Sequence, residues 1–230
     1  MPVYYLPQEP IFPPPSQAEP NGLVAVGGDL SSQRLLAAYS EGIFPWFSKG
    51  DPYLWWSPNP RLILTPDRLH IPKSLKKTIR RSQFHVTFNC AFEKVIKGCA
   101  LATRGDEQEG GTWITDEMLD AYVELHRLGY AHSVEAWLLE DGKAVLAGGS
   151  YGVALGRCFF GESMFHCRPD ASKVAFVALV GALQKFGVEL IDCQMKTEHL
   201  VRFGAWEVPR DEFVKKLQRA MSGESPQFTW

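Results

Sequence analysis

Three apolar runs separated by two short turns constrain the fold of this chain more than any other feature. The runs are HSVEAWLLE (132–140), AVLAGGSYGVAL (144–155) and CFFGESMF (158–165), with DGK and GR between them. Turns this short join only strands that run antiparallel to each other. The stretch therefore predicts a three-stranded antiparallel meander.

The segments around this meander predict helices that pack on a sheet. Residues 174–186 are apolar nearly all round, which predicts a buried helix that Asp170 or Ser172 caps and Gly187 closes. VELIDCQ (188–194) is apolar enough for the middle of a sheet. We also expect helices at 70–82, 91–100, 116–128 and 210–221, and a strand at 84–89. This order indicates an α+β protein with a mostly antiparallel sheet, the order found in acyltransferases of the GNAT superfold.

The first 62 residues differ in composition from the rest of the chain. Residues 1–20 are rich in proline, and the stretch 45–61 holds three tryptophans and four prolines. Between them, Ser31 or Ser32 can cap a short helix that Gly42 ends. We therefore expect a small N-terminal domain at 1–62 with little regular structure, followed by a larger GNAT-like domain at 63–230.

Composition bounds the class of protein. The 230 residues are 45% hydrophobic and carry a net charge of -2, so only a local basic patch could serve nucleic-acid binding. There is no apolar run of about 18 residues and no secretory leader pattern, which favours a cytoplasmic protein. None of the five cysteines has CxxC spacing, so we expect free thiols and no zinc site.

Polar side chains interrupt two strands that should be buried. Glu162 follows Phe159 and Phe160, and a carboxylate in such a place is typical of an apolar pocket that receives an amine or hydroxyl. A surface glutamate on an edge strand is the alternative. In LIDCQ, Asp192 and Gln194 point to the same face of the strand. Either a catalytic pair or a structural hydrogen-bonded pair would give this pattern.

Aromatic and basic side chains suggest a nucleotide ligand, because bases stack on flat rings and phosphates bind cations. The candidate rings are Trp46, Trp55, Trp56 and Trp113. The helix 70–82 carries the cations, although core burial of each ring and a solvated helix face are the alternatives. An acyl-CoA ligand is disfavoured, since the turn 166–173 has no glycine to cradle a pyrophosphate.

Seven motifs, in this order, resemble the leucyl/phenylalanyl-tRNA–protein transferase family. They are NGLVAVGGDLS (21–31), GIFPWF (42–47), WWSPNPR (55–61), GTWIT (111–115), GESMF (161–165), ASK (171–173) and LIDCQ (190–194). Each motif alone is weak, but the ordered set is highly specific and spans nearly the whole chain. The resemblance implies transfer of leucine or phenylalanine, and also methionine, from aminoacyl-tRNA to the N-terminal arginine or lysine of an acceptor protein. The new N-terminal residue marks that protein for degradation.

The resemblance also implies a GNAT-like larger domain that uses no cofactor, no CoA and no metal, and we expect it to act as a monomer. Asp192 and Gln194 match the catalytic pair of the family. The residues that match its substrate-binding set are Trp46 and Trp113, around the terminal adenosine, and Phe159, Gly161, Glu162, Met164 and Ile191. The cations that fall where the family contacts the tRNA body are Lys76, Lys77, Arg80 and Arg81. Family members carry methionine at Ser150 and phenylalanine at Leu179, so the preference between leucine and phenylalanine stays open.

In such a reaction the donor is an activated ester, and the acceptor amine must be neutral to attack it. Gln194 would accept a hydrogen bond from this amine, and Asp192 would polarise Gln194 and stabilise the developing ammonium. Backbone N–H groups at 161–163 are candidate oxyanion donors. Either Asp192 or a ribose hydroxyl of the tRNA would take the proton.

Three other functions stay open: an acyl-CoA N-acyltransferase, a transferase with the same donor and another acceptor, and a non-catalytic RNA-binding protein. The charges of Glu162 and Asp192 favour a cationic acceptor. The loop 101–111 is compatible with a lid or with a simple connection.

Overall fold

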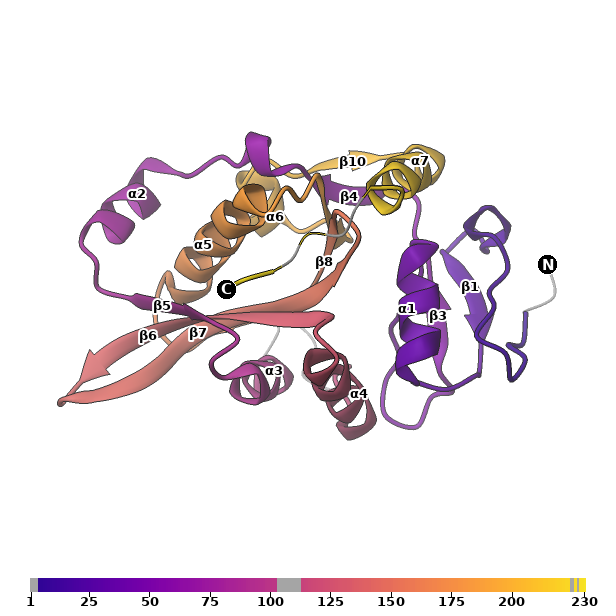
Figure 1. Ribbon diagram of the computed structural model, residues 1–230, viewed down its shortest axis with the longest axis horizontal. Helices are drawn as coiled ribbons and strands as arrows, with labels where there is room; N and C mark the ends of the chain where they lie inside the picture. Colours follow the sequence, from indigo (N-terminus) through magenta and orange to yellow (C-terminus); the bar gives the residue numbers. More distant parts are fainter. Residues whose placement is uncertain (1–3, 103–112, 224–225, 227) are drawn as a thin grey trace.

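The computed structural model describes residues 4–102, 113–223, 226 and 228–230, and its strands form two sheets (Figure 1). The three-stranded sheet has the order β1-β3-β2, with β1 (Leu23–Val26), β2 (Phe44–Pro45) and β3 (Leu54–Trp56). The seven-stranded sheet has the order β10-β4-β9-β8-β7-β6-β5. Its strands are β4 (Arg61–Leu64), β5 (His85–Phe88), β6 (Ala131–Glu140), β7 (Lys143–Leu155), β8 (Cys158–His166), β9 (Leu190–Gln194) and β10 (Trp206–Val208). The predicted α+β class with a large, mostly antiparallel sheet is confirmed.

The predicted meander is confirmed as β6, β7 and β8, each antiparallel to the next. Its two turns depend on glycine, because Gly142 and Gly156 have φ angles of 75° and 54°, which a side chain would disfavour. The strand predicted for the middle of the sheet, β9, lies between β4 and β8 as expected.

The pairing between β8 and β9 is parallel and short, and this shortness creates the site. It joins only residues 158–160 to residues 190–192. Both strands continue beyond it, β8 to His166 and β9 to Gln194. The two strand ends therefore leave room between them for a ligand.

Helices cover both faces of the large sheet. They are α1 (Ser32–Ser40), α2 (Lys73–Arg80), α3 (Phe92–Leu101), α4 (Asp116–Arg127), α5 (Ala171–Lys185), α6 (Glu198–Arg202) and α7 (Arg210–Met221), with short 3-10 turns at Pro15–Gln17 and Pro66–Arg68. One apolar cluster joins α1, α3, α4 and α7 to the face that carries Phe160. A second cluster joins α2 and α5 to the face that carries Phe159. Figure 1 shows α5 on one side of the sheet and α3 and α4 on the other.

The predicted helices all form, but the expected cap of α5 is wrong. Asp170 stands at the N-cap position with a φ of 65°, yet its side chain binds no helix N–H group. It instead accepts hydrogen bonds from Lys173 Nζ at 2.8 Å and from Thr78 Oγ1 at 3.2 Å. Ser172 lies inside the helix, so it is not the cap either.

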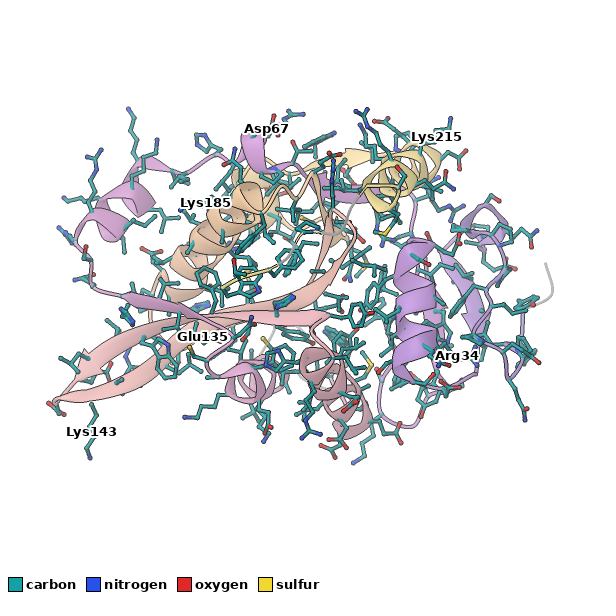
Figure 2. All side chains as sticks on the ribbon, in the orientation of Figure 1. Arg34, Asp67, Glu135, Lys143, Lys185 and Lys215 are labelled. Carbon is teal, nitrogen blue, oxygen red and sulfur yellow. The ribbon has the colours of Figure 1, made fainter. Side chains whose placement is uncertain are left out.

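The N-terminal part has more regular structure than the sequence predicts. It holds α1 and the small sheet, and Ser31 caps α1 as expected. Buried Arg34 ties the preceding segment to α1 through the carbonyls of residues 7–9 (Figure 2). The expected boundary after residue 62 falls inside β4, and one apolar cluster includes side chains from both parts of the chain. Trp55 is fully buried in that cluster, so this ring is a core residue.

In the described part of the chain, no helix has the length and apolar character needed to cross a membrane. None of the five cysteines, all of which lie in the described residues, forms a disulfide, and Cys90 and Cys167 are exposed.

Candidate active site

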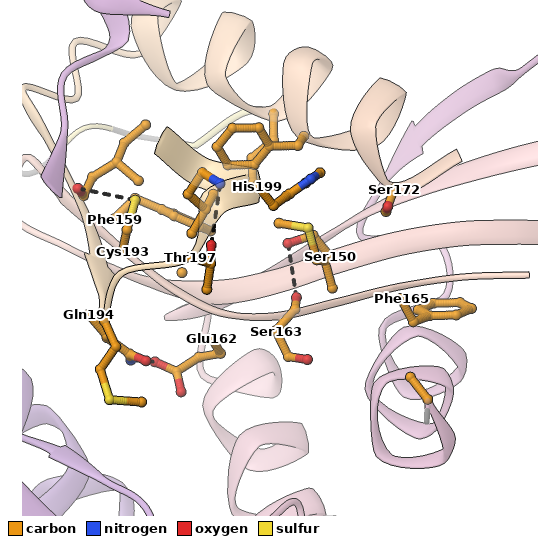
Figure 3. A pocket seen from close by; sticks show the side chains of 18 of the residues that line it. Ser150, Phe159, Glu162, Ser163, Phe165, Ser172, Cys193, Gln194, Thr197 and His199 are labelled. Carbon is orange, nitrogen blue, oxygen red and sulfur yellow. Dashed lines mark hydrogen bonds between the residues drawn. The ribbon is translucent and has the colours of Figure 1, made fainter. Parts of the chain in front are cut away.

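A cavity of about 940 Å³ lies where β8 and β9 stop pairing. Its walls come from the free ends of these two strands, from one side of α5, and from the segment 44–46 of the N-terminal part. Figure 3 shows Glu162 and Gln194 together on one side of the cavity, and Ser150, Ser172 and His199 on the other. Polar side chains therefore lie on both sides of the cavity.

All seven residues of the expected substrate-binding set line this cavity: Trp46, Trp113, Phe159, Gly161, Glu162, Met164 and Ile191. Gln194 lines it as well, whereas Asp192 does not. The four expected tRNA-binding cations, Lys76, Lys77, Arg80 and Arg81, are exposed at α2 and lie outside the cavity lining. Most of the loop expected at 101–111, and the first two residues of GTWIT, lie outside the described residues.

A β-bulge places Glu162 at the cavity. In the pairing of β7 with β8, Tyr151 faces Ser163 and Gly152 faces Gly161, so Glu162 is the extra residue of β8. A bulge interrupts the alternation of a strand and re-aims a side chain, and bulges are common beside active sites. This explains how a carboxylate enters an apolar strand without breaking its pairing with β7.

Three hydrogen bonds hold the Glu162 carboxylate. Tyr39 donates to Oε1 at 2.8 Å, Tyr122 donates to Oε2 at 3.0 Å, and the Gln194 side-chain amide donates to Oε1 at 3.1 Å. The two tyrosine hydroxyls also contact each other. We call these four residues the Glu162 network. Sequence reasoning missed both tyrosines, because Tyr39 looks like an ordinary core residue of its helix and Tyr122 lies 40 residues from Glu162 along the chain.

The network tunes the protonation of Glu162. Burial raises its pKa from 4.5 to about 7, against the lowering effect of the hydrogen bonds from Tyr39 and Tyr122. Burial and the nearby carboxylate raise the pKa of both tyrosines well above the usual value, so both stay protonated donors. At neutral pH the cavity therefore holds a carboxyl group that can both accept and return a proton.

Of the expected catalytic pair, Asp192 does not line the cavity. Asp192 is fully buried, and Arg61 donates to both of its oxygens, from Nε at 2.8 Å and from Nη2 at 2.6 Å. Arg61 belongs to the WWSPNPR motif, but no local signal in the sequence pairs it with a residue 131 positions away. Asp192 does not line the cavity, but its Oδ1 accepts the backbone N–H of Gln194, which does, at 2.9 Å.

Part of the cavity wall, between the strands and the later turns of α5, is apolar. Phe159, Met164 and Ile191 from the strands face Phe176, Leu179, Val180 and Leu183 of α5. We call this region the apolar chamber. It has the apolar walls of a pocket for an aliphatic or aromatic side chain.

Aromatic rings stand at the mouth of the cavity. Trp46 is 36% exposed and packs edge-on against Trp56, whose Nε1 donates to the Trp46 carbonyl at 2.6 Å. Trp113 is half-buried and lines the cavity as well. Partly exposed rings of this kind offer flat surfaces for stacking.

Family models match most of the chain. Residues 63–218 match the model of leucyl/phenylalanyl-tRNA protein transferase, and residues 28–59 match the model of its N-terminal domain. Among solved structures, the chain has a TM-score of 0.40 to L-PGS from Bacillus licheniformis, with 12% identity over 74% of this chain and 55% of that one. This similarity is too low to support an argument about the fold.

Curated relatives named leucyl/phenylalanyl-tRNA–protein transferase match the chain from end to end. The protein of Anaeromyxobacter sp. (strain K) is 60% identical over 100% of this chain and 96% of its own length. The protein of Magnetococcus marinus is 56% identical, and that of Myxococcus xanthus 53%, each over 100% of this chain and 97% of its own length. This chain therefore belongs to the leucyl/phenylalanyl-tRNA protein transferase family.

Proposed function

We propose that this protein transfers leucine or phenylalanine from aminoacyl-tRNA to the N-terminus of acceptor proteins. The observation that carries the proposal is the apolar chamber beside the Glu162 network, in a chain 60% identical to curated transferases of that name. The acceptors begin with arginine or lysine, methionine is a further donor amino acid, and the product is marked for degradation. The protein works as a cytoplasmic monomer without a metal or cofactor.

The donor end of the tRNA occupies the cavity in two parts. The leucine or phenylalanine side chain enters the apolar chamber, where Phe159, Met164 and Ile191 contact it. The terminal adenosine packs on Trp46 and Trp113 at the mouth. The exposed cations of α2, Lys76, Lys77, Arg80 and Arg81, bind phosphates of the tRNA body.

The acceptor site is matched to a cation. Among the described residues that line the cavity, Glu162 is the one carboxylate. A carboxylate that is half ionised near neutral pH attracts a positively charged N-terminus and its arginine or lysine side chain. An acidic acceptor would meet repulsion at the same place.

The reaction forms an amide bond and breaks an ester bond. The neutral acceptor amine adds its lone pair to the ester carbonyl carbon, and the Gln194 carbonyl oxygen orients this amine. Glu162 accepts the proton that the amine loses and returns it to the departing ribose oxygen as the ester C–O bond breaks. Glu162 suits this step because its pKa of about 7 lies near the working pH. Backbone N–H groups at 161–163 stabilise the oxyanion.

Positioning contributes a large part of the rate. Two large substrates meet at one cavity, and orientation of reacting groups is worth roughly 7–11 kcal/mol in favourable cases. The donor ester is already activated, so no further energy source enters the reaction.

We also propose a GNAT-like fold for residues 63–230 and a separate N-terminal domain at 1–62. The meander, the crossover helix α5 and the short parallel pairing of β8 with β9 support the first proposal. The two family models meet between residues 59 and 63, which supports the second. An acyl-CoA donor is disfavoured, because the turn 166–173 that would hold its pyrophosphate has no glycine.

The test incubates the purified protein with labelled phenylalanyl-tRNA and a peptide that begins with arginine, beside one that begins with aspartate. We expect transfer to the arginine peptide, and a large fall of that transfer to a measurable residual rate in Gln194→Ala with unchanged tRNA binding. Gln184→Ala, an exposed position on α5, is the matched control and should keep full activity. Transfer to the aspartate peptide alone would overturn the proposal that acceptors begin with arginine or lysine. Binding of tRNA without any transfer would favour a non-catalytic RNA-binding protein.

A further inference from the structure

Arg61 is a fully buried charge at the first position of β4, with Asp192 on the neighbouring strand as its ionic partner. The guanidinium donates through Nε and Nη2 to the two carboxylate oxygens of Asp192. A two-point contact of this kind fixes the orientation of the carboxylate as well as its position. Lysine could not reproduce it, because an ammonium is a point charge without the planar fork.

Asp192 in turn fixes the backbone of Gln194. Its Oδ1, which accepts from Arg61, also accepts the Gln194 N–H at 2.9 Å. Gln194 has a φ of 60°, in the left-handed region that residues other than glycine rarely adopt. A side chain that hydrogen-bonds the backbone two residues on is a known way to hold such a turn.

The bend at Gln194 aims its side chain at the cavity. In the pairing of β4 with β9, Leu62 faces Gln194 and Ile63 faces Asp192, so Cys193 is the extra residue of a second bulge. Beyond it, the Gln194 amide reaches Glu162 Oε1 at 3.1 Å. A bulge in each strand thus places the two polar side chains at the cavity, Glu162 from β8 and Gln194 from β9.

Two aromatic rings hold Arg61 in place. Its guanidinium carbon lies 4.8 Å from the ring centre of Phe44 and 4.5 Å from that of Phe213. Phe44 belongs to β2, two residues before Trp46 at the cavity mouth, and Phe213 belongs to α7. The charge is therefore clamped by the N-terminal part and by the last helix at once.

From this geometry we infer that Arg61 is a positioning residue for the transfer reaction: through Asp192 it holds Gln194 in the conformation that presents its side chain to Glu162 and to the acceptor amine. The inference rests on the proposed function. It gives Asp192 a positioning role too, because both of its oxygens are occupied and it does not line the cavity. Arg61 thereby couples two features of the site: the packing of the segment that carries Phe44 and Trp46, and the conformation of Gln194.

The test is a double-mutant cycle between Arg61→Lys and Gln194→Ala in the steady-state transfer assay. We expect Arg61→Lys alone to lower kcat at least tenfold while both KM values change less than threefold. In the Gln194→Ala background, the same substitution should lower kcat by no more than twofold, because the residue it positions is already gone. An equal loss in both backgrounds would mean a general structural role and would overturn the inference.

Arg34→Lys is the matched control. Arg34 is also buried, at 1% exposure, and donates hydrogen bonds to the backbone carbonyls of residues 7–9. These residues do not line the cavity. Arg34→Lys should keep kcat within twofold. If Arg61→Lys is unfolded at the assay temperature, Asp192→Asn replaces it in the same cycle with the same expectations, since asparagine keeps the oxygen that accepts the Gln194 N–H but loses the charge.

A second readout does not depend on activity. The backbone and side-chain amide signals of Gln194 in ¹⁵N NMR spectra should shift in Arg61→Lys and stay in place in Arg34→Lys. If the wild-type protein transfers nothing, the proposed function fails, while these signals still decide the positioning. Unmoved Gln194 signals in folded Arg61→Lys would overturn the inference.

Discussion

The Glu162 network and the apolar chamber share one cavity but have opposite composition. On one side Glu162, Tyr39, Tyr122 and Gln194 form a chain of hydrogen bonds, and on the other side the apolar chamber packs strand residues against α5. The hydrogen-bonded side has one defined geometry, since each oxygen has a partner. The apolar side excludes ligands only by size and shape. We propose that the first side sets the rate of the reaction and that the second sets the choice of amino acid.

The largest effect on the rate is expected for Glu162→Gln, which keeps the shape of the side chain but removes its ability to take a proton. We expect kcat to fall by about 100-fold or more, in the range typical for loss of a general base. The ratio of phenylalanine to leucine transfer should stay the same, because the apolar chamber is untouched. Single-turnover rates with both aminoacyl-tRNAs measure the two quantities, and an unchanged kcat would assign the proton to another group.

The same substitution should make the protein more stable at alkaline pH. The folded-state pKa of Glu162 is about 7, above the ordinary 4.5, so the folded protein binds the proton more tightly than the unfolded chain does. Its contribution to stability is complete below pH 4.5 and is lost as the pH rises through 7. The loss is on the order of 3 kcal/mol, since each pKa unit is worth about 1.4 kcal/mol.

Glutamine stays neutral, so Glu162→Gln escapes this loss. Thermal unfolding at pH 5 and pH 8 should therefore give wild type and variant similar midpoints at the lower pH and a higher midpoint for the variant at the upper pH. Equal differences at both values would show that Glu162 does not change its charge in this window.

On the apolar side, Ile191→Ala should change the choice of amino acid more than the rate. Ile191 lines the apolar chamber, next to Asp192, which points away from the cavity. The enlarged chamber should favour the larger side chain, and we expect the phenylalanine-to-leucine ratio of kcat/KM to rise about tenfold, the low end of what one or two methylenes decide. Asp192→Asn is the control on the adjacent residue: it should lower kcat and leave the ratio unchanged.

The difference between the two sides also separates what the sequence could reveal from what it could not. The meander and the helices follow from local spacing, and the resemblance to a family placed all seven expected substrate-binding residues at the cavity. The Glu162 network depends on contacts between residues as far as 123 positions apart, which no local pattern encodes. The partner of Asp192 was hidden in the same way, 131 positions upstream.

The small sheet escaped prediction for a different reason. β2 has two residues and β3 has three, too few to show the alternation by which a strand is recognised. The proline at the end of β2 and the tryptophan Trp55 in β3, which is buried in the structure, are typical of an aromatic-rich loop when only the sequence is considered. Pairing between these short pieces is decided by packing against α1 and the large sheet, which becomes visible only in the folded chain.

A weaker effect is expected outside the cavity. Lys76→Glu with Lys77→Glu reverses two exposed charges on α2, and we expect about fivefold weaker binding of tRNA, as for loss of contacts worth about 1 kcal/mol. The dependence of binding on salt should become less steep, while kcat at saturating donor stays the same. Filter binding at several salt concentrations measures this dependence. An unchanged slope would mean that the tRNA body binds a surface other than α2.

The smallest expected effect is that of Gly98→Ala, which tests whether α3 shapes the cavity beside Phe165. A Cβ on Gly98 would lie 2.6 Å from the Phe165 ring, closer than side chains tolerate, so Gly98→Ala must push this ring, which itself lines the cavity. We expect the donor KM to rise about twofold, with kcat unchanged, because the ring limits space and takes no part in the chemistry. Gly181→Ala is the matched control, since it also replaces a helical glycine, on α5, and its Cβ would meet nothing within 4 Å. That control should leave KM unchanged and raise the free energy of unfolding by about 1 kcal/mol from helix propensity alone. An equal KM change in both variants would trace the effect to helix stiffness, and the wall formed by Phe165 would then have no part in donor binding.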